Sequence, residues 1–145
     1  MLLGLYTSIL DKTNRIALPG ELGTQLKDGI YITQGFDRNI MVLTRDSFEM
    51  VYKRITSVNL ADPLARLLLR MILGSAYKTE VGEDGSIPIL DTLKSFARLS
   101  TEVVLVGQGD FLEIWSPEIW GKQEEQLLDV EKDPNRFSML TLSTR

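Results

Sequence analysis

The sequence predicts an α+β fold made of two similar halves, each a run of short strands followed by a helix. The stretch "LDKTNRIALP" at residues 10–19 has a counterpart, "VGEDGSIPIL", at residues 81–90. Each stretch is followed by two β-rich runs and then by a helical pattern. The internal repeat is weak in identity but consistent in its apolar positions, so both halves are expected to share one chain path.

The alignment of the halves pairs apolar residues with apolar residues. The aligned pairs are Ile16 with Ile87, Leu18 with Ile89, Leu22 with Leu93 and, after a slip of one residue, Ile40 with Leu112, Val42 with Ile114 and Phe48 with Trp120. The apolar pattern of one half is therefore repeated in the other.

In the first half, β-like residues 7–10 and 15–19 flank a polar turn, and the second strand ends at a proline. Residues 19–26 predict a brief helix at most, because Gly20 and Gly23 lower helix propensity. Residues 30–43 predict a hairpin around Gly35–Asn39. The helix expected next carries its apolar side chains on one face, which consists of Phe48, Val51, Tyr52 and Ile55.

A central helix is expected from the cap residue Asp62 and Pro63 to a stop at Gly74. Its apolar residues nearly encircle it, which predicts burial on more than one side, either between the repeats or between subunits. The second half predicts a hairpin turning at residues 107–110 and a helix capped by Ser116.

These elements suggest a division of the chain into a first repeat with the central helix at 1–75, a second repeat at 76–128 and a C-terminal tail at 129–145. The tail has no clear period, so we expect it to be mobile or to fold on a neighbour.

The composition argues against an enzyme. The chain has no cysteine and no histidine, which removes disulfides, thiol nucleophiles, imidazole bases and the usual zinc sites. The acids form no paired catalytic site, and "GEDGS" at 82–86 lacks the alternating ligands and closing glutamate of a calcium loop. We expect no cofactor and no metal. No apolar run approaches a membrane span and no export signal is evident, which predicts a cytoplasmic protein.

Charge is uneven along the chain. Residues 1–75 contain nine Lys/Arg and seven Asp/Glu, whereas residues 76–145 contain seven and thirteen. A polyanion would prefer the first half. There, Arg15 follows a turn that Asp11 can cap, and an arginine on a rigid β-element can read a guanine in a DNA groove. The alternative is that Arg15 is a solvated surface residue or pairs with a neighbouring aspartate.

The chain resembles the MraZ family of bacterial transcriptional regulators, which belongs to the AbrB-like group. The resemblance rests on an ordered series of segments: "MLLGLYTSILD", the turn Asp11–Arg15 with "IALP" ending at Pro19, "DPLARLLLRMILGSA" and "VVLVGQGDFLEIWSPEIW". It implies two AbrB-like β-α-β repeats in a small barrel-like core with flanking helices. It also implies a homo-oligomeric ring, arginine turns facing double-stranded DNA with short direct repeats, and nucleoid-associated repression of a division and cell-wall gene cluster.

The family's turn has the pattern D-x-x-G-R, and this chain departs from it. In the first copy Asn14 stands at the glycine, and Thr13 occupies a position that is often basic. In the second copy the glycine is kept as Gly85, but Gly82 and Ser86 stand at the aspartate and the arginine. The resemblance therefore assigns DNA binding to the first turn. The expected DNA-binding residues are Lys12, Thr13, Asn14 and Arg15, and the expected turn-structuring residues are Asp11, Pro19 and Gly85.

Two hypotheses follow. In the first, only the Asp11–Arg15 turn reads DNA and the second turn is architectural, so Arg15→Ala should weaken binding sharply and Ser86→Ala should change little. In the second, the chain is a divergent member that forms an oligomeric interaction scaffold without strong DNA binding, as its acidic isoelectric point of about 4.9 would favour.

Overall fold

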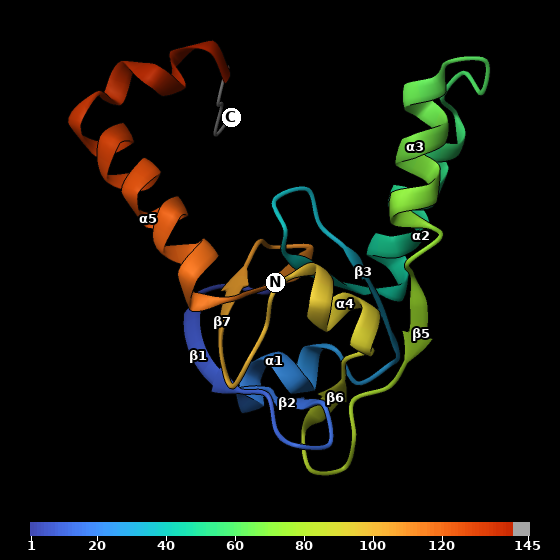
Figure 1. Ribbon diagram of the computed structural model, residues 1–145, viewed down its shortest axis with the longest axis vertical. Coiled ribbons are helices and arrows are strands. Elements are labelled where there is room, and N and C mark those ends of the chain that lie inside the picture. The colour runs from blue at the N-terminus through green and yellow to red at the C-terminus, as the bar shows by residue number, and fades with distance from the viewer. Residues whose placement is uncertain (141–145) are drawn as a thin grey trace.

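The computed structural model describes residues 1–140 as a mixed α+β molecule with two helical arms (Figure 1). The first half contains β1 (Leu5–Ile9), β2 (Arg15–Ala17), α1 (Gly20–Gln25), β3 (Ile30–Gln34), β4 (Ile40–Thr44), α2 (Arg45–Thr56) and α3 (Pro63–Ile72). The second half contains β5 (Tyr77–Thr79), β6 (Ser86–Pro88), α4 (Asp91–Phe96), β7 (Glu102–Gly107), β8 (Phe111–Trp115), α5 (Pro117–Lys132) and the 3₁₀ helix η1 (Pro134–Leu140). The predicted α+β class is confirmed.

The two halves interleave in their sheets. A six-stranded antiparallel sheet has the order β1-β7-β8-β4-β3-β5, and a two-stranded sheet pairs β2 with β6. If each first-half strand is exchanged for its counterpart, β1 for β5, β3 for β7 and β4 for β8, the order reads the same in reverse. The sequence repeat is therefore a structural repeat about a local two-fold axis between β4 and β8. Within residues 1–140 no pairing joins β1 to β5, the two outer strands of the larger sheet.

The core includes the apolar residues that the repeat alignment paired, except Phe48 and Trp120, which are half-buried outside it. Ile16 and Ile87 lie opposite each other in the β2–β6 pair, and both are fully buried. Leu22 and Leu93, on the short helices α1 and α4, are buried in the same cluster. Aligned positions thus have equivalent environments, because the two-fold arrangement brings both halves onto one core.

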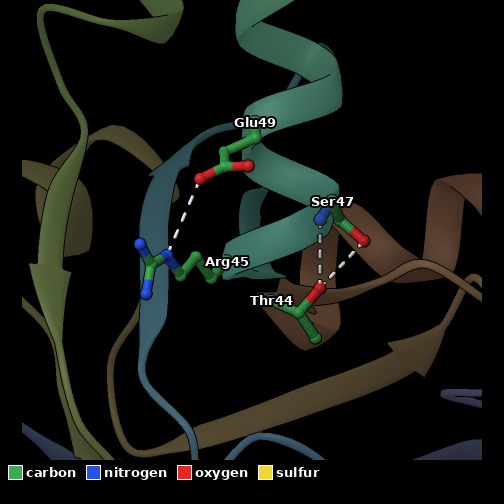
Figure 2. A network of polar contacts seen from close by, with 4 residues as sticks. All are labelled: Thr44, Arg45, Ser47 and Glu49. Carbon is green, nitrogen blue, oxygen red and sulfur yellow. Dashed lines mark hydrogen bonds and ion pairs between the residues drawn. The ribbon is translucent and has the colours of Figure 1, made fainter.

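Helix α2 begins directly after β4, and its start is set by a capping threonine. The Thr44 Oγ1 accepts a hydrogen bond from the Ser47 backbone N–H at 3.2 Å, which satisfies one of the free donors of the first turn (Figure 2). Arg45 and Glu49 form an exposed ion pair one turn apart on the same helix. Phe48, Val51 and Ile55 lie on the packed apolar face, as predicted. The prediction was wrong for Tyr52, which is 49% exposed.

Helix α3 differs from expectation in its burial. Asp62 caps it through the Leu64 N–H and Pro63 is its first residue, as predicted. Among residues 1–140, burial of α3 on more than one side is not found, since Leu64 and Leu67 are 71% and 59% exposed. The reason is that α3 makes its main contacts with α2 and β3 of its own half, so it does not lie between the two repeats and its outer face remains open.

The segment after residue 128 is helical where it is described. Ser116 caps α5 through the Ile119 N–H, and α5 continues through Asp129–Lys132 before η1 begins. The predicted tail thus begins inside a helix, and residues 141–145 lie outside the described part. At the other end of the molecule, the β1–β2 and β5–β6 turns lie together, away from the far ends of α3 and α5 (Figure 1).

Candidate nucleic-acid interface

The first turn is closed around the carboxylate of Asp11. The Asp11 Oδ1 accepts hydrogen bonds from the Thr13 N–H at 2.8 Å, the Thr13 hydroxyl at 2.6 Å and the Arg15 N–H at 3.0 Å. Backbone bonds from Asp11 N–H to the Arg15 carbonyl and from Asn14 N–H to the Asp11 carbonyl complete the turn. One aspartate thus organises three donors, which gives the turn a defined shape before any ligand binds.

Asn14 supplies the left-handed backbone that the turn needs and ties the turn to α4. Its φ is 60°, a region that asparagine tolerates better than most residues. Its side-chain amide donates to Asp91 Oδ1 at 3.0 Å and accepts from Lys94 Nζ at 3.2 Å. Since both ends of the amide are engaged, Asn14 shapes and anchors the turn.

The second turn, at residues 82–86, is closed by the same backbone hydrogen bonds as the first. Gly82 N–H donates to the Ser86 carbonyl, Gly85 N–H donates to the Gly82 carbonyl, and Gly85 has a φ of 80°. The carboxylate has moved within the turn: Asp84 Oδ1 accepts from the N–H and the hydroxyl of Ser86. Gly85 therefore has the turn-forming conformation expected of it, although Asp11 has no counterpart at residue 82.

Arg15 contacts the second turn directly. Its Nε donates to the Ser86 Oγ at 2.7 Å and its Nη2 donates to the Ser86 carbonyl at 3.0 Å. Gly82 lies against the same guanidinium, because a Cβ added there would be 2.8 Å from Nη2. The expectation that Ser86→Ala changes little treated Ser86 as remote from Arg15, and the structure shows that the two are in contact.

The other predicted residues have distinct positions. Lys12 is exposed at the tip of the turn, and within residues 1–140 its side chain makes no hydrogen bond or ion pair. Thr13 is exposed, with its hydroxyl donated to Asp11. Pro19 follows β2 and immediately precedes α1, where its carbonyl accepts from the Gly23 N–H. Of the cations expected at DNA, Lys12 is thus the exposed one and Arg15 is half-buried.

Hydrogen bonding stabilises both turn carboxylates in their charged forms. The hydroxyl of Thr13 first, and then the Arg15 N–H, lower the pKa of Asp11 below its ordinary value. The hydroxyl and N–H of Ser86 lower the pKa of Asp84, to which the positive charge of Arg15 also contributes. At neutral pH both turns therefore contain an ionised aspartate, and the negative charge of Asp84 lies near the Arg15 guanidinium.

Sequence reasoning missed the residues that hold the first turn in place: Gly82, Asp84 and Ser86 of the second turn, and Asp91 and Lys94 of α4. A signal for them was present in the repeat itself. Pairing Ile16 with Ile87 in one two-stranded sheet brings the two turns side by side. The two second-turn positions that break the pattern, Gly82 and Ser86, are those that contact Arg15.

Residues 1–140 contain neither a cluster of side chains that could bind a metal ion nor a helix that could span a membrane. Between residues 1 and 140 no group of three acidic side chains is arranged to hold a metal ion. In the same range, no helix combines the length and apolar character needed to cross a membrane.

Comparison with known proteins identifies the family. A family model described as "MraZ protein, putative antitoxin-like" matches twice, over residues 1–71 and 72–138. Three relatives carry the name transcriptional regulator MraZ. That of Thermomicrobium roseum is 32% identical over 88% of this chain and 89% of its own. That of Corynebacterium diphtheriae is 32% identical (87% and 88%), and that of Roseiflexus castenholzii is 33% identical (83% and 84%). The chain belongs to the MraZ family, a family of transcriptional regulators and not of enzymes.

Proposed function

We propose that this chain is a sequence-specific DNA-binding transcriptional regulator that reads DNA mainly through the Asp11–Arg15 turn. The observation that carries the proposal is the pre-shaped first turn, which holds an arginine at one end of the molecule. The names of the relatives, transcriptional regulator MraZ, support the same role.

The chemistry of the turn suits a DNA groove. A guanidinium is a planar fork whose two parallel N–H groups match the O6 and N7 acceptors of guanine. Lys12, exposed at the tip, is suited to a phosphate. Thr13 and Asn14 have their side chains engaged within the protein, so their contribution is the shape of the turn and its backbone groups.

The finer proposals rest on the resemblance stated above. They are an AbrB-like barrel core, the division 1–75, 76–128 and 129–145, a place in the cytoplasm at the nucleoid, and repression of a division and cell-wall gene cluster. Binding to short direct repeats fits a protein with one reading turn per subunit, because several weak contacts on one assembly reinforce each other through effective concentration.

Homo-oligomer formation is supported by two unlike surfaces. The outer face of α3 is apolar and, with Phe36 and the segment that joins α2 to α3, forms a groove of about 510 Å³ lined by Phe36, Val58, Leu64, Leu67, Leu68 and Met71. Helix α3 carries Arg66 and Arg70 and no acid, whereas α5 carries five acids and two lysines with Leu127 and Leu128 exposed. Helices α3 and α5 project on opposite sides of the molecule (Figure 1). Opposite charge on opposite sides favours a head-to-tail contact, which closes into a ring when the rotation allows.

The test is binding to duplex DNA from the region upstream of the gene, compared with an unrelated duplex of equal length, by fluorescence anisotropy at two salt concentrations. Arg15→Ala is expected to weaken selective binding by about 5- to 150-fold, the range of ~1–3 kcal/mol for a bidentate base contact. Lys12→Ala is expected to weaken binding to both duplexes alike and to reduce the salt slope by about one unit. The control is Lys78→Ala on β5, which removes an exposed lysine away from the turns and from both helical surfaces and is expected to change neither the affinity nor the salt slope.

A scaffold without strong DNA binding is the second candidate. The observation that favours it is the acidic second turn, in which Glu83 and Asp84 lie beside the Arg15 contact and repel phosphate. Wild-type protein that assembles but binds neither duplex at low salt would replace the DNA-binding proposal with this one.

A further inference from the structure

The second turn differs from the first at the two positions that meet Arg15. In the first turn the equivalent positions are Asp11 and Arg15 itself; in the second they are Gly82 and Ser86. The backbone hydrogen bonds that close the two turns are otherwise equivalent. The changes therefore leave the turn intact and alter what its surface offers to the neighbouring arginine.

Ser86 is built to accept from Arg15. It is only 5% exposed, and its hydroxyl donates to Asp84 Oδ1 at 2.7 Å. Since the hydroxyl proton is committed to Asp84, the lone pairs of Oγ remain for the Nε–H of Arg15. The Ser86 carbonyl accepts a second bond from Nη2 and so fixes the plane of the guanidinium.

Gly82 supplies the space for this arrangement. A Cβ at residue 82 would lie 2.8 Å from Nη2 of Arg15 and 2.8 Å from Asp84 Oδ1, closer than van der Waals contact permits. The glycine has no positive φ, so other residues could adopt its backbone conformation, and the atoms packed against it are what demand its small size.

The contact leaves part of the guanidinium for a ligand. Arginine has five N–H donors, and Ser86 takes one from Nε and one from Nη2. Within residues 1–140 the two donors on Nη1 and the second on Nη2 make no hydrogen bond. Two of these three donors, one on Nη1 and one on Nη2, point along the end of the guanidinium. This terminal edge can make a bidentate contact with a guanine.

We propose that Gly82, Asp84 and Ser86 form an arginine seat, in which Ser86 acts as a positioning residue that holds the Arg15 guanidinium with its terminal edge available to a base. The degenerate second turn is then part of the reading apparatus: it contributes no arginine but orients that of the first turn. Holding the guanidinium in advance reduces the side-chain entropy lost on binding. This inference rests on the proposed DNA-binding function.

The binding test uses the same two duplexes with Ser86→Ala, Ser86→Thr, Arg15→Ala and the double variant Arg15→Ala/Ser86→Ala. Ser86→Ala is expected to weaken selective binding roughly tenfold, as loss of a hydrogen bond to a charged group predicts, and Ser86→Thr, which keeps the hydroxyl, is expected to restore most of it. In the Arg15→Ala background, Ser86→Ala is expected to have no further effect. An equal loss in both backgrounds would show that Ser86 acts on the fold and would overturn the proposal.

A second measurement tests the seat without DNA. In ¹⁵N NMR spectra of the free protein, the Arg15 Nε–H signal is expected to be protected from exchange in the wild type and to lose protection in Ser86→Ala and in Gly82→Ala. The second variant keeps the hydroxyl and only fills the space. Unchanged protection in both variants would refute the seat. Failure of the wild type to bind either duplex would instead refute the DNA-binding function, and the NMR result would still decide whether Ser86 holds the guanidinium.

Discussion

At the scale of single residues, each turn depends on one carboxylate and one left-handed backbone position. Asp11 and Asp84 each use Oδ1 to collect donors from their own turn, although they stand at different positions in it. Asn14 and Gly85 supply the positive φ at equivalent places. Conformation is thus kept in both turns, while the chemistry presented to a ligand differs between them.

Asn14 allows the cost of the left-handed backbone to be measured. Asn14→Gly and Asn14→Ala both remove the bonds to Asp91 and Lys94, but only alanine keeps a Cβ at a φ of 60°. Asn14→Ala is therefore expected to be less stable than Asn14→Gly by about 1 kcal/mol in urea unfolding, since a left-handed Cβ costs ~1–2 kcal/mol. Equal free energies of unfolding would show that the left-handed backbone at residue 14 does not limit the stability of the turn.

At the scale of elements, the sequence indicates clearly where helices begin but only weakly which elements they pack against. Asp62, Pro63 and Ser116 set helix starts at the places where the sequence predicts them. Which face of α3 is covered depends on α2 and β3, and these cover only part of an almost wholly apolar surface. The exposed part is the basis for the proposed contact between subunits.

Leu67, an exposed residue of the α3 groove, allows the proposed contact between subunits to be tested. A charged side chain in the groove would be desolvated by an apolar partner, so Leu67→Glu is expected to shift the protein towards smaller assemblies in sedimentation velocity. The matched control is Leu90→Glu, which replaces another half-exposed leucine outside the groove and is expected to leave the assembly unchanged. A similar shift in both variants would argue against α3 as the contact.

At the scale of the whole molecule, the two repeats depend on each other. β1 of the first half pairs with β7 of the second, β5 of the second pairs with β3 of the first, and β4 and β8 join at the centre. In the smaller sheet, likewise, β2 of the first half pairs with β6 of the second. Both repeats thus contribute residues to the larger hydrophobic core, and we expect them to fold as one unit.

Separated halves should therefore fail to fold alone. Residues 1–71 and 72–145 are each expected to be unfolded as monomers, because each loses all the pairings that cross between halves. Mixing the two is expected to restore the far-ultraviolet circular dichroism of the intact chain. A folded monomer of either half would contradict the interleaved topology.

The sequence by itself determined the local features of this protein. These are the repeat, the short strands, the hairpins, the helix caps and the polar turn that carries Arg15, and each depends on residues close together in the chain. Tertiary structure alone decided what Arg15 touches. Its partner Ser86 lies one repeat away, and the contact exists only because β2 and β6 pair antiparallel about Ile16 and Ile87. Local patterns report conformational preference, whereas a contact between distant residues depends on the register of strands and on the packing of a shared core.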